Sequence, residues 1–207
     1  SYATGLVNWL VAKNSNKVSF SIIRAAYRGY ETGKIVTDNQ FERNIMQASS
    51  SGIDIGLYFF TQATNEAEAI EEADYIVNLI RTHNIPVKYP IAIDTEYSGS
   101  KTNGENDYAG RADNLTPTER TNVCIAFCER IKSYGYTPMI YASKNWFYNN
   151  LEADRLTGYD HWVAHYTGSV DSPTDYKYHY TMWQYTSSGS VSGINGTVDL
   201  NVCNKKY

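Results

Sequence analysis

The sequence predicts an α/β fold: a TIM-like (β/α) barrel with reduced later helices, whose first strand is missing from this chain. Strand-like apolar runs alternate with helix-like runs along most of the chain, which favours a parallel sheet with crossover helices. Seven strand candidates occur, one fewer than a closed (β/α) barrel contains. With 207 residues and 42% hydrophobic content, we expect one domain spanning residues 1–207.

The first half of the chain opens on a helix and then alternates strand, helix and strand. A helix or helical turn from Asn8 precedes a strand at 18–27. The next segment carries apolar residues at helical spacing, with Asp38 as candidate N-cap and Gly52 as the stop. The following strand covers 53–60. A barrel that opens on a helix lacks the strand that should precede it.

The middle of the chain contains the clearest helix signals. The run 64–83 is acidic early and basic late, the charge order that the helix dipole favours. A strand at 87–96 follows, and a polar loop then runs to Asn114. The sequence TPTE at 116–119 is a capping box with proline at the first helical position, and this helix should end near Gly135.

Beyond Gly135 the elements become shorter. Four further strand candidates occur at 137–143, 161–167, 180–187 and 198–201. The segments between them lack long amphipathic helices, so we expect the later helices of the barrel to be reduced.

Composition excludes several partners. The net charge of −4 gives no basic face for nucleic acid, and no run approaches the roughly 18 apolar residues of a membrane span. We therefore expect neither a nucleic-acid nor a membrane partner, and no signal peptide is visible at the start of the chain. The cysteines Cys124, Cys128 and Cys203 are too few for a disulfide framework, which favours buried thiols.

Asp94 and Glu96 stand two residues apart at the end of the strand YPIAIDTE. Strand residues two apart share a face, and the carboxyl ends of barrel strands form the catalytic face. Two carboxylates about 5 to 9 Å apart suit glycoside hydrolysis, and their mutual repulsion raises one pKa. A solvated strand end or a salt bridge is the plainer alternative. Because no spaced third ligand accompanies the pair, we predict no metal and no cofactor.

Two histidines and many aromatic residues occur in or near the predicted strands. His161 and His165 have zinc spacing only on a helix; in the strand that their neighbours favour they lie about 13 Å apart, so the zinc interpretation fails. The chain has 19 Tyr and 4 Trp against 6 Phe, an excess of amphipathic rings. Such rings suit a wet groove that stacks sugars as well as they suit a core.

Several segments together resemble glycoside hydrolase family 25, the N-acetylmuramidase-type lysozymes. They include IIRAAYRGY, YPIAIDTE, FCERIKSYGYTPMIYASKNWF, WVAHY and MWQYTSSGSVSGINGTVDLN, in family order over nearly the whole chain. The resemblance implies cleavage of the β-1,4 bond between N-acetylmuramic acid and N-acetylglucosamine in peptidoglycan. It also implies that the protein acts outside the cell or at the cell wall.

The resemblance assigns roles to three acids: Glu96 as general acid, Asp94 as its partner carboxylate, and Asp199 as a further active-site acid. It leaves open whether the substrate's 2-acetamido oxygen or a water molecule attacks. Strand positions expected to line the sugar groove are Tyr58, Tyr141, Trp162, Tyr166, Trp183 and Gln184.

The chain departs from the family pattern at its start, where GLVNW matches the segment after the family's first strand. Exposed barrel edges then predict an oligomer, with the gap filled by a neighbouring chain, or a loosely folded domain of low activity. Two other functions stay open. One is a cell-wall glycan-binding module that does no chemistry, and the other is an unrelated barrel hydrolase acting on a glycan such as chitin.

Overall fold

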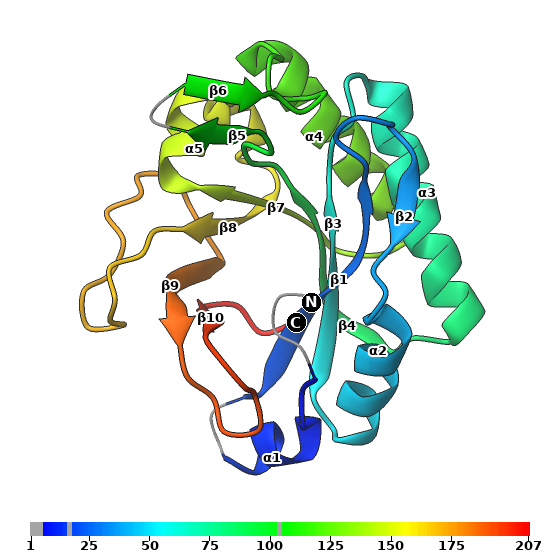
Figure 1. The fold of residues 1–207 in the computed structure, drawn as a ribbon, viewed down its shortest axis with the longest axis vertical. Helices are drawn as coiled ribbons and strands as arrows, with labels where there is room; N and C mark the ends of the chain where they lie inside the picture. The colour runs from blue at the N-terminus through cyan, green and yellow to red at the C-terminus, as the bar shows by residue number, and fades with distance from the viewer. Residues whose placement is uncertain (1–5, 16–17, 103–104) are drawn as a thin grey trace.

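A curled, mixed β-sheet forms the centre of the molecule in the computed structural model (Figure 1). The structure describes residues 6–15, 18–102 and 105–207. The main sheet has eight strands in the order β10-β9-β8-β7-β4-β3-β1-β2, and β5 and β6 form a separate hairpin. The strands are β1 (Phe20–Arg28), β2 (Ile35–Thr37), β3 (Asp54–Phe60), β4 (Val87–Asp94), β5 (Ser100–Thr102), β6 (Glu105–Tyr108), β7 (Pro138–Ser143), β8 (Asp160–Ala164), β9 (Met182–Gly189) and β10 (Val198–Cys203).

The long helices belong to the first two thirds of the chain, and α3 packs directly against α4 on the outside of the sheet (Figure 1). The helices are α1 (Trp9–Asn14), α2 (Phe41–Ser50), α3 (Glu66–His83), α4 (Pro117–Ser133), α5 (Lys144–Asn149) and the 3-10 helix η2 (Ala153–Leu156). After α4 the described helices are short, which confirms the expected reduction of the later crossovers.

Local capping explains where the helices begin. Thr116 and Glu119 form the predicted capping box of α4, with Pro117 at its first position. The predicted role of Asp38 as the N-cap of α2 is wrong, because Gln40 occupies that position. The Asp38 carboxylate instead accepts hydrogen bonds from the Gln40 amide and from Arg24.

All seven predicted strands are present in the structure, but the sheet is not uniformly parallel. The six strands β1, β3, β4, β7, β8 and β9 run parallel. The last strand, β10, is antiparallel to β9, and β2 is antiparallel to the last three residues of β1. Neither β2 nor the β5–β6 hairpin was predicted.

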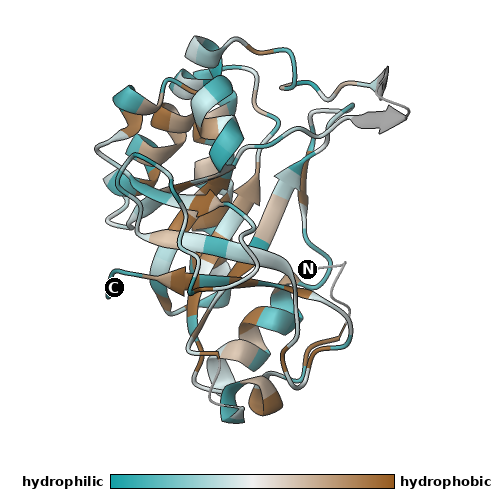
Figure 2. Ribbon diagram, turned by 90° about the vertical axis from the view of Figure 1, so that its left-hand side faces the viewer, coloured by the Kyte–Doolittle hydropathy of each residue, from teal (hydrophilic) through white to brown (hydrophobic). Residues whose placement is uncertain are grey.

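Apolar side chains fill the space between the sheet and the helices. The brown segments of Figure 2 concentrate in the central strands, whereas helical turns that face outward are largely teal. Fully buried residues of this core come from strands and helices alike: Phe41, Phe59, Ile76, Ile93, Phe127 and Ile140. The alternation of apolar and polar faces therefore places the helices on the outside of the sheet.

The sheet stays open between its first and last long strands. In the part of the chain that the structure describes, no strand pairs with β1 over residues 20–25 on the side away from β3. The outer edge of β10 is likewise unpaired over the described residues, since β10 pairs with β9 alone. A cavity lies between these two edges.

Candidate active site

A cavity of about 550 Å³ brings the three predicted acids together. Asp94 is the last residue of β4, and Glu96 follows two residues later in the loop. Asp199 reaches the same end of the sheet because β10 is antiparallel, so that its first residue, Val198, pairs with Gly189 at the end of β9. All three acids line the cavity. Their side chains therefore converge from strands that are far apart in the sheet.

The surroundings of the acids favour their protonated forms. Burial raises the pKa of Asp94, and the negative charge of Glu96 raises it further. Burial and the charge of Asp199 raise the pKa of Glu96, and burial raises the pKa of Asp199 itself. Carboxyl groups that share a site in this way retain a proton at a pH where isolated carboxyls are ionised. The cavity can therefore supply a proton to a bound molecule.

Asp94 and Glu96 differ in their access to solvent. Asp94 is 5% exposed, and its Oδ1 atom has no hydrogen-bond partner among the described residues. Its backbone carbonyl accepts a hydrogen bond from the Thr61 amide at 3.0 Å, which fixes the end of β4. Glu96, by contrast, is an exposed residue that lines the cavity. The more accessible of the two carboxyls is thus the one expected to donate a proton.

Aromatic rings and an amide form one wall of the cavity. Tyr141 and Trp162 meet edge to face with ring centroids 4.6 Å apart, and Tyr58 contacts the same indole at 6.4 Å. The amide oxygen of Gln184 accepts hydrogen bonds from the hydroxyls of Tyr141 at 2.9 Å and Tyr166 at 3.0 Å. These contacts hold the rings in fixed orientations, which suits stacking against a flat sugar face.

Not every predicted groove residue lines the cavity. Trp183 is 3% exposed and packs in the main hydrophobic core, where its indole nitrogen donates to the carbonyl of His165. It is therefore not a wall residue. The reason is strand alternation: Gln184 faces the cavity, so its neighbour Trp183 must point to the other side of β9. Tyr166 is exposed at the rim and joins the wall through Gln184.

One charged residue of the cavity was missed by the sequence analysis. Arg24 lines the cavity from β1, and its Nε atom donates to the buried Asp38 at 2.6 Å. The signal lies in the segment SIIRAAY, where a single charge interrupts an apolar strand at an inward-facing position. A buried strand tolerates such a charge when it is paired.

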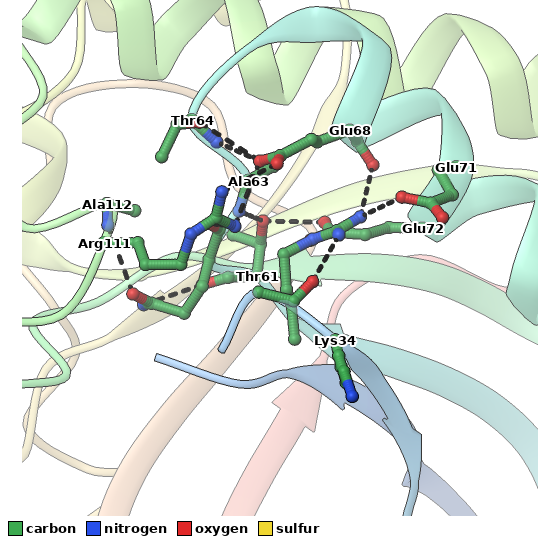
Figure 3. Close-up of polar contacts among 12 residues, drawn as sticks. Lys34, Thr61, Ala63, Thr64, Glu68, Glu71, Glu72, Arg111 and Ala112 are labelled. Atoms are coloured by element: carbon green, nitrogen blue, oxygen red, sulfur yellow. Dashed lines mark hydrogen bonds and ion pairs between the residues drawn. The ribbon is translucent and has the colours of Figure 1, made fainter. Parts of the chain in front are cut away.

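A buried polar network supports the strand ends next to the acids (Figure 3). Arg28 of β1 donates to Glu72 of α3 at 2.7 Å, and the Thr61 hydroxyl donates to the other oxygen of Glu72 at 2.7 Å. Burial raises the pKa of Glu72 to about 7, while hydrogen bonds from Thr61 and Arg28 act in the opposite direction. Because the Thr61 amide bonds to the Asp94 carbonyl, the network links α3 to the strand that carries the acid.

A second ion pair in Figure 3 attaches the loop that follows the β5–β6 hairpin. Arg111 contacts Glu68 at 2.7 Å and also donates to the backbone carbonyl of Gln62 at 3.2 Å. The Gln62 side chain in turn accepts a hydrogen bond from the Ala112 amide at 3.2 Å. These contacts join the loop to the end of β3, beside the cavity.

His161 and His165 both have structural partners. His161 is buried, with one ring nitrogen 2.9 Å from the Tyr176 hydroxyl and the other 3.0 Å from the Leu156 carbonyl. His165 contacts the Thr174 hydroxyl at 3.0 Å. Among the described residues, no group of three or more His, Cys, Asp or Glu side chains is arranged to hold a metal ion.

Cys124 and Cys128 are buried free thiols, and burial raises the pKa of both, so they fit the apolar role expected for them. None of the helices described combines the length and apolar character that crossing a bilayer requires.

Acidic side chains that gather at the edge where the parallel strands end, beside an aromatic wall, define an open α/β barrel of the glycoside hydrolase class. The family model of glycosyl hydrolases family 25 matches residues 4–194, and the chain belongs to this family.

The sequences of several relatives match this chain over most of its length. It is 26% identical to Lysozyme M1 of Streptomyces globisporus, covering 99% of this chain and 66% of that protein. It is also 26% identical to the uncharacterized protein YegX of Escherichia coli K12, covering 92% of this chain and 61% of that protein. Among solved structures, the modular autolysin LytC of Streptococcus pneumoniae superposes with a TM-score of 0.79 at 26% identity, covering 97% of this chain and 44% of that one. The chain thus spans about three fifths to two thirds of these two curated relatives.

Proposed function

We propose that this chain hydrolyses the β-1,4 bond between N-acetylmuramic acid and N-acetylglucosamine in peptidoglycan. The observation that supports this most is the convergence of Asp94, Glu96 and Asp199 on one cavity, with the pKa values of all three raised. The function fits the family to which the chain belongs and the names of its lysozyme relatives.

In this proposal Glu96 is the general acid. Its raised pKa keeps a proton available, and its exposure to the cavity lets it reach the oxygen of the leaving sugar. Asp94 stabilises the positive charge that develops at the anomeric carbon, whether the 2-acetamido oxygen of the substrate or a water molecule attacks. Asp199 adds a third negative charge facing the other two and holds the Glu96 proton more tightly.

The walls of the cavity position the glycan. Tyr58, Tyr141 and Trp162 present rings to the cavity, and Gln184 lies among them with its amide oxygen engaged by tyrosine hydroxyls. Tyr166 extends this wall to the rim. Stacking of sugar faces on such rings aligns the scissile bond with the acids. This positioning uses binding energy to lower the activation barrier of the reaction.

The structure of LytC solved in complex with a synthetic peptidoglycan ligand supports the choice of substrate. Relatives named as lysozymes occur in Clostridium acetobutylicum, as an autolytic lysozyme, and in Streptococcus phage Cp-9. We place the action of this chain at the bacterial cell wall on these grounds.

Release of reducing ends from purified peptidoglycan tests the proposal. Glu96→Gln should lower the rate by about 10²- to 10⁴-fold, because general acid catalysis contributes that much, while binding of the glycan persists. Glu42→Gln is the matched control, since Glu42 is an exposed glutamate on α2 with a side chain 69% exposed. Binding by the unaltered chain without any release of reducing ends would instead support the non-catalytic glycan-binding module.

A further inference from the structure

Arg24 is the one Lys or Arg side chain among the described residues that line the acidic cavity. It projects from β1, and its register partner on β3 is Tyr58, which lines the same cavity. The Arg24 side chain is 26% exposed, so a molecule in the cavity can reach it. Because it is positively charged, Arg24 favours acceptor groups such as carboxylates and carbonyls, whereas the three acidic side chains of the cavity do not.

Asp38 holds the Arg24 guanidinium in place. The Nε atom donates to Asp38 Oδ2 at 2.6 Å, and the Asp38 side chain is 1% exposed. The other Asp38 oxygen accepts a hydrogen bond from the Gln40 amide at 2.8 Å, so both oxygens are engaged. Neither Nη atom of Arg24 hydrogen-bonds to any residue that the structure describes. Those donors remain available in a fixed orientation, which is the arrangement that binds planar acceptors well.

Arg24 lies close enough to Asp94 to influence its ionisation. Burial and the charge of Glu96 raise the pKa of Asp94, and the positive charge of Arg24 acts in the opposite direction. The same guanidinium acts against the burial and the Asp94 charge that raise the pKa of Tyr58. In a sugar whose anomeric carbon lies over Asp94, the substituent on C3 is two ring carbons away. A group that neighbours Asp94 is therefore within reach of that substituent.

We propose that Arg24 binds the lactyl group on C3 of the muramoyl sugar by donating hydrogen bonds from its Nη atoms to the lactyl carbonyl or carboxylate oxygen. The proposal rests on the function proposed above and names the residue that selects its substrate. N-acetylglucosamine carries only a hydroxyl at C3 and lacks the lactyl carbonyl or carboxylate oxygen, so it loses the hydrogen bonds that this oxygen would accept from the Nη atoms. Arg24 thus distinguishes a muramoyl glycan from a glycan built of N-acetylglucosamine alone.

Two disaccharides that differ only in the lactyl group test this inference by calorimetry. They are N-acetylglucosaminyl-N-acetylmuramic acid and N,N′-diacetylchitobiose, referred to below as chitobiose. The unaltered chain should bind the muramoyl disaccharide about 10-fold or more tightly than chitobiose, the size of one hydrogen bond to a charged group. Arg24→Gln should remove this preference and leave the affinity for chitobiose unchanged. Arg24→Lys should retain part of it, since lysine supplies the charge without the planar fork.

Two further variants keep the test decisive. Arg24→Gln leaves the buried Asp38 without its cation, so the double variant Arg24→Gln/Asp38→Asn removes both charges together and should show the same loss of preference. Lys88→Gln removes a cation from an exposed pair with Asp54 and should change neither affinity.

The proposal is overturned if the Arg24 variants keep the muramoyl preference, or if they weaken both disaccharides equally. It is also overturned if the unaltered chain shows no preference. If the unaltered chain shows the preference but releases no reducing ends from peptidoglycan, the hydrolytic function fails while the assignment of Arg24 stands.

Discussion

Asp199 controls how tightly Glu96 holds its proton. Burial raises the pKa of Glu96 first, and the negative charge of Asp199 raises it further. A general acid works while it is protonated, so a raised pKa extends activity toward higher pH, and activity falls as the pH rises through that pKa. Asp199→Asn removes one of the two causes. We expect the alkaline limb of the pH profile of kcat/KM to move to lower pH in this variant, in addition to any loss of rate.

The profile is measured on a soluble peptidoglycan fragment over the acidic and neutral range. Asp54→Asn is the control, because Asp54 pairs with Lys88 on the exposed surface and does not line the cavity. Its profile should match that of the unaltered chain. An alkaline limb that stays in place in Asp199→Asn would show that Asp199 does not act on the proton of the general acid.

The sequence identified the acids more readily than the rest of the cavity. Asp94 and Glu96 could be predicted because an apolar strand that ends in two carboxylates specifies both their spacing and their face. The prediction of Asp199 depended on the family resemblance, because no local sequence signal shows that β10 runs antiparallel. The prediction that Trp183 lines the groove is wrong, because side chains alternate along a strand and only every second one of β9 can face the cavity.

At the scale of elements, the buried pair of Arg28 and Glu72 joins β1, β3 and α3. Both side chains are almost fully buried, and Glu72 also accepts the Thr61 hydroxyl. Glu72→Ala leaves the Arg28 cation buried without this partner, and breaking a buried pair costs about 3 to 5 kcal/mol. We expect that loss in the free energy of unfolding, measured by denaturant titration.

Glu71 supplies the matched control for this element. It also contacts Arg28, at 2.8 Å, but its side chain is 64% exposed. Glu71→Gln should cost under about 1 kcal/mol, as exposed pairs usually do. Equal losses in the two variants would contradict the idea that burial makes the contact between Arg28 and Glu72 important.

Elements with strong local signals were predicted well, and elements that depend on distant pairing were not. The capping box of α4 and the seven long strands follow from local pattern, because caps and apolar runs are encoded within a few residues. The β5–β6 hairpin lies in a polar loop with no apolar alternation to reveal it. The direction of β10 depends on its partner β9, which a reading of one segment cannot supply.

At the scale of the whole molecule, the open side of the sheet is the feature with most consequence for behaviour in solution. Residues 20–25 of β1 and the outer edge of β10 have no strand partner among the described residues, and the cavity lies between them. Unpaired strand edges present backbone donors and acceptors to any extended chain. The curled sheet therefore has a place where another strand can add.

We expect this chain to self-associate through these edges as its concentration rises, and sedimentation velocity measures this directly. Ser21→Lys places a charge on the open edge of β1, where Ser21 lines the cavity, and should shift the chain toward monomer because edge lysines oppose strand addition. Ser50→Lys adds the same charge on exposed α2 and should leave association unchanged. A chain that is monomeric at every concentration, or that associates equally with Lys at position 21, would mean that the edges do not pair between molecules. The openness of the sheet would then be tolerated by the single molecule, because solvent in the cavity satisfies the backbone groups of both edges.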